Sequence, residues 1–471
     1  MSGKGKNAID MTGGSLWKNI LVFSLPLMMT QMLEVLFNLS DVAIAGKYAD
    51  YIALGAVGST ALLVSLFTGI LIGMGAGVNV RTAHQLGAEK TSGSSETVAR
   101  TVYSGLIVCL IIGIILCLVC NIFARPMLET LKTKDELIES AVLYLKIYAL
   151  GMPAMAVYNF GNGVLSACGE TKKPLVYLSV AGVLNVILNI FFVVVCKKAA
   201  DGVAIASVIA QYLSASMIMC HLLRRKDSCK LRLSNRYFDT SACGGVLMIG
   251  IPTGMQNAIF AVANLFVQTG VNHFDAVMVS GNSAAQNADT LIFNVMAAIY
   301  TACASFISRN HGEGKNDRIL KSYFISLFYS FAAGGIFGGA LLLFGREFLS
   351  LFTNESAVAE AGMERLTIMG WSYAISAFMD CTIAASRGLG KSVVPTIIVI
   401  MGSCVFRVIW VYTIFAHFQT ITSLYLLYSF SWSITAVAEI IYFMRIYKKC
   451  MKGCLTDTSY KPEKKQTQNI P

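Results

Sequence analysis

A polar stripe interrupts the first apolar segment of the chain. Glu34, Asn38 and Asp41 are spaced i, i+4 and i+7, so on a helix they share one face over about 10 Å. A carboxylate at the centre of a membrane-spanning helix costs about 2.5–3.5 kcal/mol, and such groups generally face a cavity or a partner. The stripe therefore predicts a polar surface beside this helix. The alternatives are that Asp41 reaches external water and that Glu34 has a structural, hydrogen-bonded role.

Two asparagines in "VLNVILNIFF", Asn185 and Asn189, are one helical turn apart. Amide oxygens and a carboxylate are the hard ligands that suit Na⁺, and a carboxylate alone suits H⁺. A cation site built from Asp41 and this pair is one interpretation. The other is that the asparagines are hydrogen-bonding glue between helices.

Further ionisable residues lie inside or at the edges of apolar segments. Asp380 is expected either to line a cavity or to pair with a basic residue. Arg407 is expected to snorkel or to pair with a carboxylate such as Asp380 or Glu439. Asp289 is expected to be partly solvated, and Lys146 and Glu439 to reach an interface.

Membrane-spanning helices must position these residues. The chain has 471 residues, 55% of them hydrophobic and 13% charged, whereas soluble domains have about 25% charged residues. Its apolar runs reach the ~20 residues that cross about 30 Å of hydrocarbon as helix. The predicted fold class is an all-α polytopic membrane protein with twelve transmembrane helices. The expected spans are 16–46, 52–82, 98–124, 138–160, 174–196, 202–223, 243–271, 283–308, 321–345, 363–385, 393–415 and 421–446.

Basic residues set the expected orientation. An even number of spans places both termini on one side, and Lys and Arg concentrate there, in 224–236 and after Arg445. By the positive-inside rule both termini are expected in the cytoplasm, in a multi-pass protein of the cell membrane. This asymmetry accounts for the net charge of +11 better than nucleic-acid binding does, so no nucleic-acid partner is expected.

The second half of the chain repeats landmarks of the first half, in the same order and at nearly constant offset. They are "SLPL" at 24–27 with "GIPT" at 250–253, "LGAEK" at 86–90 with "HGEGK" at 311–315, and "ACGETKKP" at 167–174 with "GLGKSVVP" at 388–395. Two parallel six-helix lobes around a central cavity are therefore predicted. The offset aligns Asn38 with Asn264 and Asp41 with Val267, so the carboxylate occurs in one lobe only.

The expected boundaries follow from the repeat and from the basic linker between its halves. The N-terminal lobe comprises residues 1–228, the C-terminal lobe comprises 229–451, and the polar, Lys-rich residues 452–471 form a disordered cytoplasmic tail.

The remaining motifs concern packing rather than chemistry. Gly69, Gly73 and Gly77 form a small-xxx-small ladder that predicts close helix packing. The 13 cysteines imply no disulfide framework and no zinc spacing. No Walker loop, HExxH or nucleophile elbow occurs. The chain is therefore not expected to be an enzyme, and active transport by it would use an ion gradient.

Five segments together resemble the multidrug and toxic compound extrusion (MATE) family of efflux transporters, over about residues 12–450. They are "SLPLMMTQMLEVLFNLSDVAIAG", "GMGAGVNVRTAHQLGAEK", "SACGETKKPLVYLSVAGVLNVILN", "IGIPTGMQNAIF" and "SRGLGKSVVPTIIVIMGSCVFRVIWVY". The resemblance is to the branch with a first-helix Asp (DinF-like). It implies a V-shaped pair of six-helix lobes that exports amphipathic organic cations in exchange for Na⁺ or H⁺.

The resemblance also implies site residues. Asp41 matches the first-helix Asp of an N-lobe cation site and Asn185 a fifth-helix Asn, whereas Asn189 stands where some members have Asp. Ser207 keeps a hydroxyl where Thr is common. Na⁺ at Asp41, Asn185 and Asn189 is thus one possibility and H⁺ the other, with no further cofactor expected.

The family's other branch uses acidic residues in the seventh and tenth helices. Here the seventh helix carries Gln256, Asn257 and Asn264 but no carboxylate, and Asp380 is displaced from the position of that branch's tenth-helix Asp. The coupling role is therefore not carried over to the C-lobe. Glu34, Asn38, Gln256, Asn264 and Asp380 are instead expected to line the substrate cavity.

The function expected from the resemblance is secondary active multidrug antiport by alternating access. The expected partners are small organic cations or drugs and the lipid bilayer, and the chain is expected to be a monomer. The alternative is a flippase for lipid-linked or polyprenyl substrates, which would favour a strongly basic cavity, whereas most intramembrane charges identified here are acidic.

Overall fold

The computed structural model describes residues 8–49 and 51–456, and in these ranges the regular structure is entirely helical. The helices are α1 (Leu16–Tyr48), α2 (Tyr51–Ser92), α3 (Glu96–Thr130), α4 (Asp135–Ala149), α5 (Met152–Ala167), α6 (Lys172–Ile190), α7 (Ala200–Arg224), α8 (Thr240–Val271), α9 (Ala276–Gly312), α10 (Asn316–Leu349), α11 (Ser356–Gly388), α12 (Val393–Val399), α13 (Phe406–Trp410), α14 (Ala416–Phe418) and α15 (Ile421–Thr456). A short 3₁₀ turn spans Asn235–Tyr237.

The described helices provide ten or eleven candidate membrane spans. Ten helical segments are long and apolar enough to cross a membrane, and α4 with α5 gives an eleventh if this pair, bent by 44°, is one span. Pro153 lies in the first turn of α5 and interrupts the backbone ladder there. The remaining expected span, 363–385, falls on α11, which has 33 residues but is less apolar than these candidates.

π-helical turns interrupt two of the spans. Phe191–Val195 extends α6, and Ile400–Val405 and Val411–Phe415 flank α13. Such turns widen the hydrogen-bond ladder and often occur at functional sites. One begins two residues after Asn189, and the other two enclose Arg407.

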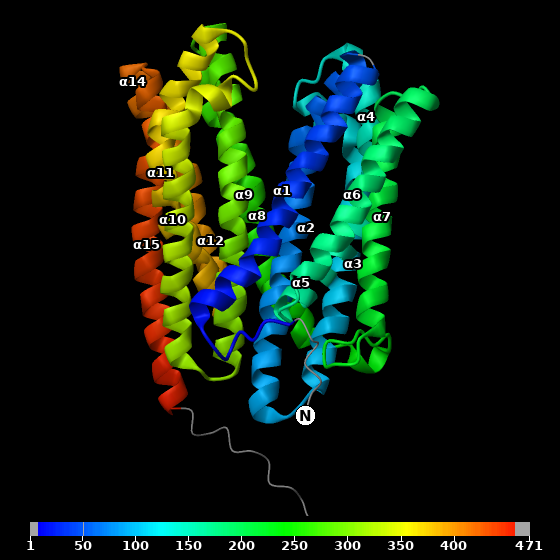
Figure 1. Cartoon of the computed structure of the whole chain (residues 1–471), viewed down its shortest axis with the longest axis vertical. Coiled ribbons are helices and arrows are strands. Elements are labelled where there is room, and N and C mark those ends of the chain that lie inside the picture. Colours follow the sequence, from blue (N-terminus) through cyan, green and yellow to red (C-terminus); the bar gives the residue numbers. More distant parts are fainter. Residues whose placement is uncertain (1–7, 50, 457–471) are drawn as a thin grey trace, which may run out of the picture.

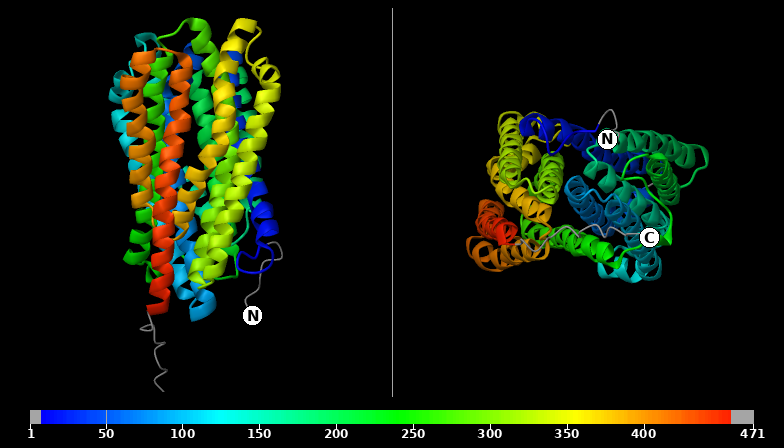
Figure 2. Two further views of the ribbon diagram at one scale, coloured as in Figure 1. Left: turned by 90° about the vertical axis from the view of Figure 1, so that its left-hand side faces the viewer. Right: turned by 90° about the horizontal axis from the view of Figure 1, so that it is seen from below.

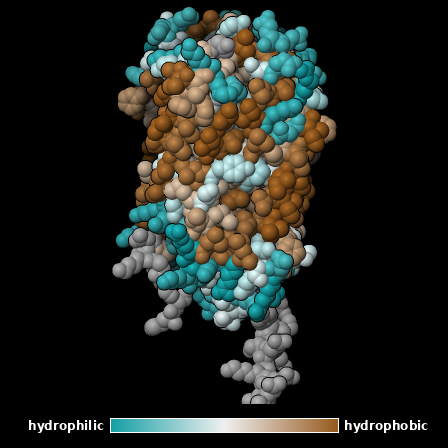
Figure 3. Space-filling model, turned by 90° about the vertical axis from the view of Figure 1, so that its right-hand side faces the viewer, coloured by the Kyte–Doolittle hydropathy of each residue, from teal (hydrophilic) through white to brown (hydrophobic). Residues whose placement is uncertain are grey.

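The helices form two bundles, α1–α7 and α8–α15, that diverge toward the end opposite the termini, as Figure 1 shows. Most helices run roughly along the long axis in the two further views of Figure 2. The face shown in Figure 3 carries an apolar belt between hydrophilic ends, as expected for a surface in contact with lipid. We call the end that holds the termini the closed end and the opposite end the open end.

The glycine ladder of α2 makes the close contact between bundles, as its spacing predicted. A Cβ atom on Gly73 would lie 2.4 Å from the backbone nitrogen of Gly254, and one on Gly77 would lie 2.5 Å from the carbonyl oxygen of Val246. Because no Cβ fits there, α2 and α8 approach backbone to backbone. Farther toward the open end, Asn257 donates from Nδ2 to the carbonyl of Gly69 at 3.3 Å.

Helices α2 and α9, which the repeat makes equivalent, also meet between the bundles. Asn79 Nδ2 donates to Ser305 Oγ at 2.8 Å across a sequence separation of 226, the offset of the repeat. Ser308 Oγ donates to the carbonyl of Val80 at 2.7 Å. Gly169 and Gly390, which the repeat also aligns, both have positive φ, +85° and +75°. Equivalent positions of the two halves therefore adopt equivalent structure.

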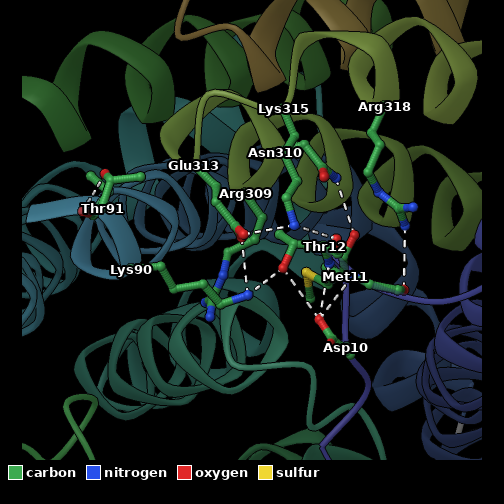
Figure 4. Close-up of polar contacts among 12 residues, drawn as sticks. Asp10, Met11, Thr12, Lys90, Thr91, Arg309, Asn310, Glu313, Lys315 and Arg318 are labelled. Carbon is green, nitrogen blue, oxygen red and sulfur yellow. Dashed lines mark hydrogen bonds and ion pairs between the residues drawn. The ribbon is translucent and has the colours of Figure 1, made fainter. Parts of the chain in front are cut away.

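Residues 9–14, which we call the N-terminal strap, cross the closed end from the first bundle to the second (Figure 4). On one side, the Ile9 amide donates to the carbonyl of Gly169 at 3.1 Å. On the other side, second-bundle side chains donate to strap carbonyls. These donors are Asn310 to Met11 (3.1 Å), Lys315 to Thr12 (2.9 Å), and Arg318 to Gly13 (3.3 Å) and Gly14 (3.2 Å).

Glu313 organises the charges around the strap. It pairs with Lys90 of α2 at 3.0 Å and with Lys315 at 2.8 Å, and Lys90 also donates to the Thr12 hydroxyl. Partial burial disfavours the charged carboxylate, but hydrogen bonds from Lys315, Thr12 and Lys90 outweigh it and hold the pKa of Glu313 below its usual value. Glu313 therefore stays ionised and links both bundles to the strap.

The structure also differs from the sequence expectations for the cysteines and for the C-terminal tail. Cys168 and Cys229 form a close pair across 61 residues of sequence, which the cysteine pattern did not predict. The two cysteines meet because the segment after α7 folds back beside the end of α5.

Helix α15 runs to Thr456, into the range expected to be a tail, and the rest of that range, 457–471, lies outside the described residues. The boundary between residues 228 and 229 stays a prediction.

Candidate functional site

Four of the predicted cation-site residues come together inside the first bundle. Asp41 of α1 is buried and accepts two hydrogen bonds, from Asn189 Nδ2 to Oδ1 at 2.5 Å and from Ser207 Oγ to Oδ2 at 3.0 Å. Asn185 Nδ2 donates to Ser207 Oγ at 3.2 Å. Helices α1, α6 and α7 thus each contribute to one continuous polar cluster, which excludes for Asp41 the alternative of simple exposure to external water.

The orientation of the Asn189 amide is informative about what the cluster can hold. Its Nδ2 donates both to Asp41 and to Asn185 Oδ1 at 3.3 Å, whereas its own Oδ1 is buried without a hydrogen-bond partner. A buried acceptor without a partner is unfavourable. If the Asn189 amide rotated by 180°, its oxygen and nitrogen would exchange places. The oxygen would then point toward Asp41, and a cation bound there would be its partner.

The oxygens of this cluster fit a small hard cation. They are one carboxylate, two amide carbonyls and one hydroxyl, which suit Na⁺, while the carboxylate alone can take H⁺. The described residues hold no cluster of three or more His, Cys, Asp or Glu side chains that could bind a metal.

The rest of the α1 stripe lies deeper in the same bundle. Glu34 is half-buried and within electrostatic range of Tyr148 and Tyr158. Asn38, one turn farther on, is exposed. Glu34 is thus close to the tyrosines of α4 and α5, on the same helix as Asp41 but outside its hydrogen-bonded cluster.

The candidates in the second bundle do not form one site. Gln256 is buried, and its Oε1 accepts a hydrogen bond from Arg387 Nη2 at 2.5 Å. Asn264 is exposed, and its Oδ1 accepts from Arg407 Nη1 at 3.1 Å. Asp380 is half-buried and within electrostatic range of Arg387 and Arg407.

The structure contradicts the sequence expectations for Glu439 and Arg407 and agrees with the one for Lys146. Glu439 was expected to reach an interface but is fully buried, and both carboxylate oxygens lack a hydrogen-bond partner among the described residues. Arg407 neither snorkels nor forms an ion pair, because it is 2% exposed and binds neutral groups. Lys146 is exposed, as expected for a lysine that reaches an interface.

Arg365 is a residue that sequence reasoning missed. It is 1% exposed, donates to Asn282 Oδ1 at 2.9 Å and pairs with Asp289, which also accepts from Tyr373. Arg365 stands near the start of the expected span 363–385, and no role was predicted for it from the sequence. The available signal was Asp289, a carboxylate near the outer end of another span that needed a partner.

Comparisons with known proteins bear on the family of the chain. The sequence profile of the MatE family matches residues 26–191 and 252–413. A probable multidrug resistance protein, YoeA of Bacillus subtilis, is 23% identical over 391 residues, 82% of this chain and 84% of the relative. Another, NorM of Thermotoga maritima, is 22% identical over 417 residues, covering 85% of this chain and 86% of the relative.

A solved structure supports the fold. It is described as the outward-facing conformation of a multidrug resistance MATE family transporter, and it superposes with a TM-score of 0.86 at 19% identity, over 95% of this chain and 99% of that one. The profile match covers both halves of the chain, and the all-helical, V-shaped architecture agrees with the resemblance seen in the sequence. The chain belongs to the MatE family.

Proposed function

We propose that the chain is a secondary active antiporter that exports amphipathic organic cations in exchange for Na⁺ or H⁺. The observation that carries the proposal is the buried Asp41–Asn189–Asn185–Ser207 cluster, an ion-sized set of oxygens inside one bundle. The names of the relatives, which describe multidrug resistance proteins, support the export of drugs. Nothing in these comparisons favours the alternative of a lipid-linked flippase.

The structure suits the outward-open state of an alternating-access cycle. We place the closed end in the cytoplasm of the cell, because both termini and the basic linker lie there, and the open end outside. The similarity to a structure described as outward-facing supports this placement. Opening toward the cytoplasm then requires separation of the α2–α8 and α2–α9 contacts and release of the strap.

Coupling would arise at Asp41. In the arrangement seen, amide and hydroxyl donors satisfy the carboxylate. Binding of Na⁺ would remove the need for the Asn189 donor, and protonation would replace an acceptor with a donor, so either ion changes the contacts among α1, α6 and α7. An ion or drug shifts the equilibrium between the two states only by its difference in affinity for them.

Transport of a fluorescent organic cation by purified protein in proteoliposomes tests the proposal, with Na⁺ and H⁺ gradients imposed separately. We expect one gradient to drive efflux and Asp41→Asn to abolish it while the protein still folds and inserts. Asn121→Leu is a matched control, because Asn121 hydrogen-bonds only within its own helix, to Cys117. Undiminished gradient-driven efflux by Asp41→Asn, or no response to either ion, would exclude the proposed coupling.

A further inference from the structure

Arg407 is a buried guanidinium without an acidic partner. It lies on α13, between two π-helical turns, and is 2% exposed. Its Nη1 donates to Asn264 Oδ1 at 3.1 Å and its Nε to Ser431 Oγ at 3.4 Å. Both acceptors are neutral, no carboxylate of the described residues lies within 4.0 Å, and Nη2 has no hydrogen bond there. A buried charge of this kind is unfavourable unless a counter-ion joins it.

The other buried arginines of the second bundle differ from it. Arg365 is neutralised by Asp289. Arg387 hydrogen-bonds Gln256 and has the charges of both Asp380 and Glu439 nearby. Arg407 has only the more distant Asp380 as a source of negative charge, while Arg365 adds positive charge close by. Of these three arginines, Arg407 therefore has the least negative charge close to it.

Aromatic rings surround the guanidinium and shape the space beside it. Its carbon lies 4.6 Å from the ring centre of Tyr428, 5.6 Å from Phe260 and 5.8 Å from Trp432. Cation–π contacts of this kind hold an arginine in place without neutralising its charge. A planar aromatic ligand with an acidic group matches both the rings and the free Nη2.

The position of Asn264 shows which space Arg407 borders. Asn264 is seven residues after Asn257, so the two side chains leave α8 on nearly the same face. Asn257 contacts Gly69 of the first bundle, and Asn264 lies two turns farther toward the open end, where it is exposed. Arg407, bonded to Asn264, therefore stands at the wall of the space between the bundles, just beyond the point where they touch.

We propose that Arg407, with Asn264, Phe260 and Trp432, forms a subsite for the carboxylate of an aromatic, amphipathic substrate. One unpaired guanidinium balances one negative charge, which favours a carboxylate over a doubly charged phosphate. Resting on the proposed export function for its biological meaning, this subsite makes Arg407 a specificity-determining residue for substrates that carry an acid.

Equilibrium binding of a matched pair of rhodamines tests the subsite without any ion gradient. The methyl ester is a cation, and the free acid is a zwitterion that differs only by the carboxylate. Fluorescence polarisation with purified protein would measure both affinities. For Arg407→Gln we expect the affinity for the acid to fall about tenfold or more, the size of a lost hydrogen bond to a charged group, and the affinity for the ester to change less than about threefold.

A second variant keeps the test valid if Arg407→Gln does not fold. Asn264→Asp is nearly isosteric and places a carboxylate against Arg407 Nη1, so an internal counter-ion would compete with that of the ligand. We expect the same loss of acid binding, with ester binding maintained. Arg346→Gln is the control, because Arg346 is an exposed arginine of the same bundle that pairs with Glu360.

The outcomes separate this inference from the proposed function. The subsite is overturned if wild-type protein does not bind the acid, or if either variant leaves acid binding unchanged or weakens acid and ester equally. A preference for the acid that depends on Arg407 supports it, even if gradient-driven export were to fail. Gradient-driven export of the ester with no such preference would leave the proposed function intact and refute the subsite.

Discussion

At the residue scale, the Asn189 amide decides how Asp41 is held. We predict that Asn189→Leu lowers the apparent affinity for the coupling ion about tenfold or more, because it removes a donor to the carboxylate and one of the few neutral oxygens available to a cation. The dependence of efflux on the concentration of the driving ion would measure this. Asn121→Leu should leave that dependence unchanged, and an equal shift in both variants would show a non-specific effect.

The Arg365–Asp289 pair stabilises the second bundle, as a second residue-scale prediction tests. Arg365→Met leaves the partly buried Asp289 without its cation and should cost about 3 kcal/mol, whereas removal of both charges in Arg365→Met with Asp289→Leu should cost less. Denaturant unfolding in detergent would measure both. Arg346→Met should cost at most about 1 kcal/mol, because its partner Glu360 is exposed. A double variant no more stable than Arg365→Met would contradict the prediction.

Sequence reasoning at this scale worked where residues share a helix and failed where they do not. The spacing of Asn185 and Asn189 predicted one face, and the resemblance brought Asp41 to it. The partners of Arg365 and Arg407 come from α8, α9 and α15, and no spacing within one helix encodes such contacts. Both expectations for Arg407, snorkelling and an ion pair, were therefore wrong, and its neutral partners were seen only in the fold.

At the element scale, the glycine ladder of α2 controls how closely the bundles approach at the closed end. Gly77→Ala would put a Cβ 2.5 Å from the carbonyl oxygen of Val246, so α2 and α8 must separate. We predict that this destabilises the outward-open state and increases the labelling rate of a cysteine introduced at the closed end. Gly58→Ala on the same helix meets open space and should change nothing. Equal labelling in both variants would count against the ladder as the determinant of closure.

The charges around the strap give a second element-scale prediction. Glu313→Gln removes both ion pairs that link α2, the strap and the start of α10, so the closed end should open more often and the same labelling rate should rise. Since the pKa of Glu313 is depressed, its stabilising effect is present above the usual pKa near 4.5. It is lost as the pH falls through the lower value of the folded state. Asp317→Asn, which affects an exposed pair with Lys321, is the control, and a similar effect in it would refute a specific role.

The elements themselves were largely predictable. Apolar runs longer than about 20 residues have few alternatives to helix, since lipid cannot satisfy backbone groups. The bend between α4 and α5 follows from Pro153. The π-helical turns were not predicted, because no residue type requires them and packing against neighbouring helices decides them.

At the scale of the whole molecule, the Asn79–Ser305 contact on the repeat axis offers a test of alternating access. We predict that Asn79→Cys with Ser305→Cys, in a background lacking other reactive cysteines, forms a disulfide upon oxidation that holds the closed end shut and stops transport. Reduction should restore it. Efflux of a fluorescent cation would measure both states, with the single variants as controls. Full transport by completely cross-linked protein would show that this contact need not separate.

The two-lobe architecture was visible in the sequence because duplication left matching landmarks. The contacts between lobes were not. They depend on equivalent helices, α2 and α9, meeting on an axis, and on a strap that precedes the first span. The periodicity of a single helix predicts neither the contact between α2 and α9 nor the docking of the strap.

The docking of the strap has a consequence for biosynthesis. The second-bundle side chains that donate to its carbonyls lie 299 to 305 residues later in the chain. At translation rates of about 5–20 residues per second, those residues are made roughly 15–60 s after the strap. During that time the first bundle must insert with its leading segment undocked. The strap thus leaves the ribosome well before its partners and can dock only once the second half of the chain has been made.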